Sequence, residues 1–97
     1  VVTSEFGRTI AENGSNGTDH GTANCMFVMG GSVLGGRLAG TWPGIAPGQR
    51  FEGMDLRPTT DYRTVLAEIV QKRLQNQNTQ YVFPGFNAGN GIGAVAA

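Results

Sequence analysis

The sequence predicts a protein of the α/β class, because it combines two short apolar runs with one amphipathic helical stretch. The runs are residues 1–3 (Val-Val-Thr) and 25–29 (Cys-Met-Phe-Val-Met), and each is followed at once by polar or glycine residues. Such short, continuous apolar runs are typical of strands buried in a parallel sheet. The helical stretch begins near residue 61, where apolar residues recur at steps of three and four.

The first half of the chain alternates between these strands and glycine-rich connections. Residues 1–3 are expected to form a buried parallel strand that delivers Glu5 into a loop, and residues 11–23 read as a loop because they contain three glycines with Asn, Ser, Thr and Asp. Residues 25–29 form the second buried strand, in which Cys25 is expected to be an inert buried thiol. Residues 30–50, with seven glycines and two prolines, allow only short elements.

The second half contains the predicted helix and a tail. Residues 51–56 alternate apolar and polar, which favours an edge strand. Thr59 or Thr60 is the expected N-cap of a helix of about four turns, with Glu68 and Lys72 as an i,i+4 ion pair. Its apolar stripe consists of Tyr62, Val65, Leu66, Ile69, Val70 and Leu74. Residues 81–86 are expected to dock the end of the chain, and residues 87–97 form a flexible Gly/Ala-rich tail.

The composition excludes several classes of function. A net charge of zero with 14% charged residues gives no basic surplus for binding nucleic acid. No apolar run approaches the roughly 20 residues that a membrane-spanning helix needs. One cysteine excludes an internal disulfide and a cysteine-rich zinc site. Because residues 1–3 read as the middle of a strand, we expect the chain to be the C-terminal piece of a longer protein whose N-terminal part partners it.

Two short stretches near the start hold the residues that suggest chemistry. Glu5 follows the first strand, and Asp19 and His20, the only histidine, lie in the glycine-rich loop. Carboxylate and imidazole are metal ligands, and Arg8 suits an anionic substrate because its guanidinium binds oxyanions bidentately. The alternatives are a loop histidine bound to backbone, an Asp19 that orients His20 or closes an Asx turn, and an Arg8–Glu5 salt bridge.

Several motifs together resemble the C-terminal part of the bacterial DUF1501 family, which is related to the alkaline phosphatase and sulfatase superfamily. They are Ser4-Glu5-Phe6-Gly7-Arg8-Thr9, Gly17-Thr18-Asp19-His20-Gly21, Gly30-Gly31, Gly35-Gly36-Arg37, Trp42-Pro43-Gly44, Thr59-Thr60-Asp61-Tyr62-Arg63 and Phe83-Pro84-Gly85-Phe86. The resemblance covers roughly residues 1–86. It implies the C-terminal portion of an alkaline phosphatase-like α/β sandwich with a mostly parallel sheet and its active site at the C-terminal ends of the strands.

The resemblance also implies a site with one or two divalent metals, zinc or calcium. Asp19-His20 looks like the superfamily's acidic–His pair, but that pair follows a buried strand directly. We therefore prefer Glu5 in place of the acidic residue and His20 as the later histidine, with Asp19 as a further ligand. Phe6 then stands where the paired histidine is expected, so one metal position has lost a ligand.

The resulting expectation is a metal-dependent hydrolase of a small phosphate or sulfate ester, with Arg8 binding the anion. The nucleophile and remaining ligands are expected in the N-terminal part, so that this fragment alone is inactive. The alternative, which Phe6 favours, is a non-catalytic binding or structural protein that retains the sulfatase-like fold. Because many relatives carry twin-arginine signals, the resemblance further implies an exported or periplasmic location.

Overall fold

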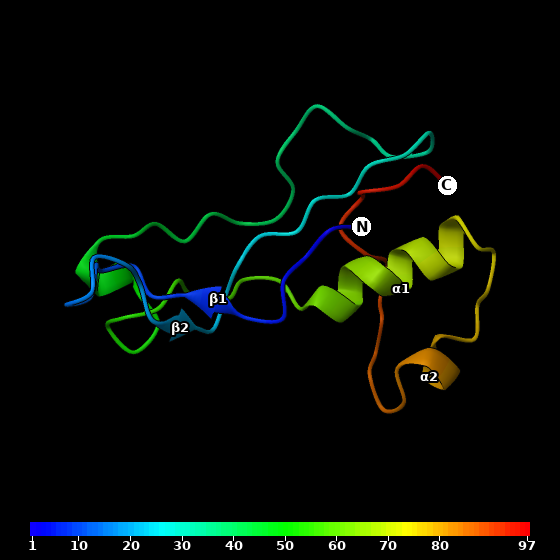
Figure 1. Cartoon of the computed structure of the whole chain (residues 1–97). Helices are drawn as coiled ribbons and strands as arrows, with labels where there is room; N and C mark the ends of the chain where they lie inside the picture. The colour runs from blue at the N-terminus through cyan, green and yellow to red at the C-terminus, as the bar shows by residue number, and fades with distance from the viewer. The chain divides into compact units, whose positions relative to one another are not determined.

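The computed structural model describes residues 1–97 as a small mixed α/β chain with one two-stranded antiparallel sheet and two helices (Figure 1). The elements in chain order are β1 (Gly7–Arg8), β2 (His20–Gly21), the 3-10 turn η1 (Pro47–Gln49), α1 (Tyr62–Lys72) and α2 (Thr79–Val82). The chain divides into two compact units. The first comprises residues 1–27 and 41–59, and the second comprises residues 28–40 and 60–97. Neither α1 nor α2 has the length and apolar character of a membrane-spanning helix.

The two apolar runs do not form buried parallel strands. Val2 pairs with Phe27 through an antiparallel bridge, with backbone N–O distances of 2.8 and 2.9 Å. Val2 is 52% exposed and Phe27 60% exposed, and Cys25 is exposed as well. Parallel pairing needs a crossover connection, usually a helix, whereas residues 4–26 simply turn back on themselves. The pairing is therefore antiparallel, and the structure gives no support for the predicted parallel sheet or for the sulfatase-like sandwich.

The first unit is organised around the β1–β2 hairpin. Gly7 lies opposite Gly21 and Arg8 opposite His20. The predicted loop over residues 11–23 is confirmed as far as Asp19, but its residues 20–21 form β2. Asn13 shapes the loop by accepting hydrogen bonds from the backbone N–H groups of Ser15 (2.9 Å) and Gly17 (3.1 Å).

A second turn, at residues 51–55, packs against the hairpin strand. Phe51 and Asp55 face each other in a backbone bridge, and Asp55 also bridges Thr9. The predicted edge strand over residues 51–56 is wrong, because Glu52 (φ 55°) and Gly53 (φ 74°) adopt the left-handed conformation that reverses the chain.

The second unit is built on α1. The predicted helix is confirmed, but it starts at Tyr62 and ends at Lys72, before Leu74, the last residue of the predicted apolar stripe. Asp61, not Thr59 or Thr60, is the N-cap, because its side chain accepts the N–H of Arg63 at 2.9 Å. Of the predicted apolar stripe only Val65 is buried, and the residues at its two ends, Tyr62 and Leu74, are exposed. Arg63 also lies over the ring of Phe86, 4.2 Å from its centroid, and so attaches the predicted docking segment to the start of the helix.

The C-terminal residues belong to the core of this second unit. Ala88, Ala94 and Val95 are among its few buried apolar side chains. Val95 forms an antiparallel bridge with Val33, and Figure 1 shows this red C-terminal segment beside the cyan segment that contains Val33 and beside α1. Residues 91–96 thus pack against the rest of the unit, where the sequence suggested a flexible tail.

Candidate functional site

Phe6, Arg8 and His20 form one exposed surface on the β1–β2 hairpin, which we call the hairpin face. Residues opposite each other in an antiparallel pair share a face, and so do residues two apart in one strand. Arg8 is directly opposite His20, and Phe6 precedes Arg8 by two. The rings of Phe6 and His20 lie 3.9 Å apart between centroids, and the guanidinium carbon of Arg8 lies 5.6 Å from the Phe6 centroid.

Two glycines allow the strands to approach closely enough for this contact. A Cβ on Gly7 would overlap the backbone of Ala23, and a Cβ on Gly21 would lie 2.6 Å from the carbonyl carbon of Arg8. No side chain larger than hydrogen fits at either position without movement of backbone. The glycines that follow Phe6 and His20 in the two sequence motifs are therefore what brings Phe6, Arg8 and His20 together.

Arg8 is held in place on the hairpin face. Its Nη1 donates a hydrogen bond of 2.8 Å to the carbonyl oxygen of Thr18, and its stacking on Phe6 limits rotation of the guanidinium. The salt bridge with Glu5, the alternative role for Arg8, does not form. Since guanidinium has five N–H donors, those not bonded to Thr18 are available on an exposed side chain.

Asp19 lies on the other side of the hairpin from His20. Its backbone N–H donates to Thr9 Oγ1 at 3.1 Å, and its Oδ1 accepts from Asn13 Nδ2 at 2.9 Å. Asp19 lines a pocket of about 150 Å³ together with residues that include Thr9, Glu12 and Arg50, whereas His20 does not. Asp19 directly precedes β2, and neighbouring residues of an extended backbone point their side chains to opposite sides.

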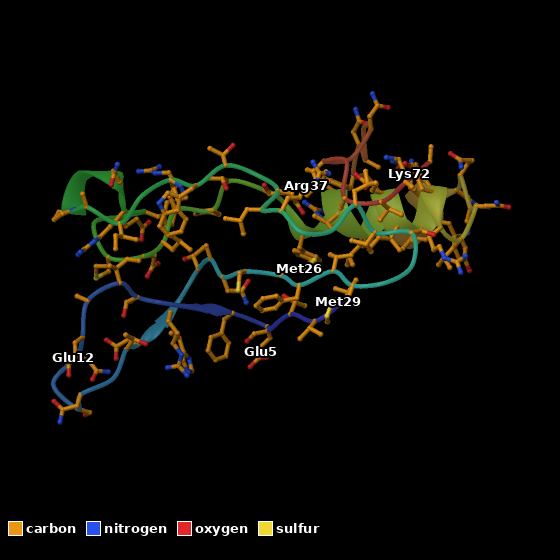
Figure 2. The ribbon with its side chains drawn as sticks, turned by 90° about the horizontal axis from the view of Figure 1, so that it is seen from above. Glu5, Glu12, Met26, Met29, Arg37 and Lys72 are labelled. Carbon is orange, nitrogen blue, oxygen red and sulfur yellow. The ribbon has the colours of Figure 1, made fainter.

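Glu5 is exposed at a bend before β1 (Figure 2). Figure 2 also shows Glu12 far from it, in the loop at the other end of the hairpin. No group of three or more His, Cys, Asp or Glu side chains is arranged to hold a metal ion. Of the four residues singled out in the sequence, the structure thus brings Arg8 and His20 together, and it keeps Asp19 apart from His20.

Two residues that the sequence did not single out, Asp55 and Asn24, hold the hairpin through side-chain hydrogen bonds. Asp55 is buried (8% exposed), and its Oδ2 accepts a hydrogen bond of 2.9 Å from Thr22 Oγ1, just after β2. Asn24 donates through Nδ2 to the carbonyl oxygens of Ser4 and Phe6, both at 3.1 Å. These contacts join distant parts of the chain, and no local spacing signals them.

In a comparison with protein families, the family described as "Protein of unknown function (DUF1501)" matches residues 1–81. That range includes both motifs of the hairpin face. No curated protein matches the chain. No solved structure matches it either.

Proposed function

We propose, for this chain that belongs to the DUF1501 family of proteins of unknown function, a role in binding an anionic ester at the hairpin face. The observation that carries the proposal is the pairing of Arg8 with His20 across β1 and β2. The pairing gives a guanidinium and an imidazole on one exposed surface, both next to the Phe6 ring.

The donor chemistry of this surface suits a phosphate or sulfate ester. Guanidinium binds the oxygens of such groups through two parallel N–H bonds, and imidazole supplies an N–H donor in either protonation state. Arg8 is already restrained by Thr18 and Phe6, so binding costs it less side-chain entropy than it would a free arginine. The uncharged, half-buried Phe6 ring offers an apolar surface for the rest of a small ester.

Binding without catalysis is the form of the proposal that the geometry favours. The resemblance to the alkaline phosphatase and sulfatase superfamily implies a divalent metal with Glu5, Asp19 and His20 as ligands. These three residues do not fit that role as they stand, because Asp19 faces the Glu12–Arg50 pocket while His20 stacks on Phe6. We therefore derive no hydrolytic step, and we assign Arg8 and His20 to recognition of the anion.

The direct test is a titration of the ¹⁵N-labelled chain with phenyl phosphate and, separately, phenyl sulfate. Saturable shifts are expected at the amides of Gly7, Arg8, His20 and Gly21. Arg8→Gln should weaken binding about 10- to 150-fold, since a charge-assisted hydrogen bond contributes about 1.5–3 kcal/mol. Arg73→Gln, which makes the same charge change at the end of α1, should leave the affinity within about twofold. Shifts that do not saturate, or equal losses in the two variants, would refute the proposal.

A further inference from the structure

Glu68 is buried in a setting that the proposed function does not use. It lies in the middle of α1, is only 1% exposed, and is the largest fully buried side chain of the molecule. The sequence suggested an ordinary surface pair with Lys72. The Lys72 Nζ does lie 3.8 Å from Oε2, but the closest partners of the carboxylate are elsewhere.

Both oxygens of Glu68 accept hydrogen bonds from the backbone of the C-terminal segment. Oε1 accepts the N–H groups of Ile92 at 2.6 Å and Gly93 at 2.7 Å, and Oε2 accepts the N–H of Val95 at 2.7 Å. Two consecutive N–H groups on one oxygen resemble the backbone nests that bind anions. One carboxylate therefore satisfies three backbone donors of a single short segment.

The same segment is bound from its other side by residues 32–37. The N–H of Leu34 donates to the carbonyl of Ala94 at 2.9 Å, and the N–H of Ala96 donates to the carbonyl of Ser32 at 2.8 Å. Arg37 donates through its guanidinium to the carbonyl oxygens of Leu34 and Gly93. Figure 2 shows Arg37 and Lys72 in this part of the second unit.

Gly91 is required at the point where the segment reaches Glu68. Its φ is 78°, and a Cβ there would overlap the Glu68 carboxylate. Gly89 also has a positive φ, of 62°, but a Cβ there would have no neighbour within 4 Å. The two glycines therefore have a similar backbone conformation, and only one of them makes room for the carboxylate.

We propose that Glu68 is a protonation-controlled latch: its ionised carboxylate holds residues 91–96 against α1 and residues 32–34, and its protonation releases them. A neutral carboxyl group carries an O–H donor and loses the charge that strengthens its three bonds to N–H groups. Release leaves the N–H of Leu34 and the carbonyl of Ser32 without partners.

The positive charge near Glu68 also favours its ionised form, which is the form that holds the segment. On α1, Lys72 approaches the Glu68 carboxylate. Arg37, which belongs to residues 28–40, hydrogen-bonds the C-terminal segment at Gly93. Neither α2 nor residues 91–96 carry a charged side chain. Burial alone would raise the pKa of Glu68, but the N–H groups of Val95, Gly93 and Ile92, together with Lys72, hold the pKa below its ordinary value of 4.5. Since the unfolded-state pKa is the higher one, the latch is fully engaged above that value and opens as the pH falls through the folded-state pKa.

The test is an NMR titration of the full chain from neutral pH to about pH 2. The ¹³Cδ signal of Glu68 reports its ionisation, and the amides of Ile92, Gly93 and Val95 report its hydrogen bonds. The expected result is one shared midpoint, with a drop in the heteronuclear NOE of residues 91–96 and retention of the α1 signals. Amides that keep their shifts and their protection from exchange after Glu68 is protonated would overturn the proposal.

Variants test the latch at neutral pH. Glu68→Gln should release residues 91–96. Glu12→Gln, which neutralises an exposed carboxylate in the hairpin loop, should leave the NOE values of residues 91–96 unchanged. Gly91→Ala should also release the segment, and Gly89→Ala should not. Both substitutions place alanine at a positive φ, but only the methyl group at position 91 would overlap the Glu68 carboxylate. If Glu68→Gln does not fold, the glycine pair and the titration of the unmodified chain still decide the outcome. Equal behaviour of the two glycine variants would contradict the latch.

Discussion

The imidazole of His20 lies against the ring of Phe6, with centroids 3.9 Å apart and planes inclined by 38°. Phe6 lies just before β1 and His20 starts β2, so this contact joins the two sequence motifs directly. Phe6 occupies the position where the resemblance leads one to expect a second histidine. In this chain it supports the single histidine instead, and it also lies beneath the guanidinium of Arg8.

Replacement of the Phe6 ring should therefore loosen the positions of His20 and Arg8 on the hairpin face and lower its affinity for an anionic ester. Phe6→Leu keeps an apolar side chain but removes the aromatic pair, which contributes about 0.5–1.5 kcal/mol. We expect the His20 Hδ2 and Hε1 resonances to lose their ring-current shift, and phenyl phosphate to bind about two- to tenfold more weakly. Phe27→Leu is the control, because Phe27 is exposed and pairs with Val2 through its backbone. Unchanged His20 resonances in Phe6→Leu would contradict the stacking.

The close approach of β1 and β2 depends on Gly21. A Cβ at this position would lie 2.6 Å from the carbonyl carbon of Arg8 and 2.9 Å from the N of Thr9, which are backbone atoms that cannot rotate away. Gly21→Ala is expected to lower the free energy of unfolding by about 1–3 kcal/mol. Gly14→Ala serves as the control, since a Cβ there would meet nothing within 4 Å. Urea unfolding measures both changes, and an equal effect would show that the strands have room for the methyl group.

Metal content distinguishes recognition of an anion from metal-dependent hydrolysis. Because Asp19 and His20 lie on opposite sides of the hairpin, we expect no stoichiometric zinc or calcium after incubation with either ion and gel filtration. Plasma mass spectrometry of the unmodified chain and of His20→Ala makes the comparison. One bound metal per chain that disappears in His20→Ala would place His20 among the ligands and restore the hydrolase interpretation.

Local sequence signals predicted the elements that local interactions determine. The loop between β1 and β2 was predictable because Asn and Gly favour turns, and Asn13 does close the turn through its side chain. The helix was predictable because its apolar residues recur at helical spacing. Strand pairing was not, because an apolar run such as residues 25–29 has the same composition whether its partner is parallel or antiparallel.

The site was predictable only in part for the same reason. The motifs pointed to Arg8 and His20, but their pairing depends on the register of two strands of two residues each. Had β2 been recognised as a strand, the period of two would have placed Asp19 and His20 on opposite faces. Glu68 gave no local signal, because its three donors lie 24 to 27 positions away in a glycine- and alanine-rich segment that reads as flexible.

The N-cap of α1 is Asp61, whereas the sequence led us to expect Thr59 or Thr60. Asp61 caps the helix through the N–H of Arg63, and the Arg63 side chain binds both carboxylate oxygens, at 3.0 and 2.7 Å. Asp61→Ala should lower the free energy of unfolding by about 1 kcal/mol. Thr60→Ala, which removes one of the two N-caps expected from the sequence, should change it by less than about 0.5 kcal/mol. Urea unfolding followed by far-UV circular dichroism measures both, and a larger loss in Thr60→Ala would move the cap to Thr60.

The capping contribution of Asp61 should also depend on pH. Hydrogen bonds from the side chain and backbone of Arg63 hold the pKa of Asp61 below its ordinary value of 3.8. Because the pKa is lower in the folded state, the contribution is fully present above the unfolded-state value and is lost as the pH falls through the folded-state value. Asp61→Asn retains an oxygen for the Arg63 N–H but cannot titrate. Its unfolding free energy should therefore fall less steeply below about pH 4 than that of the unmodified chain. Glu68 titrates in both proteins, so the difference between the two curves isolates Asp61, and parallel curves would show that its carboxylate does not stabilise the helix.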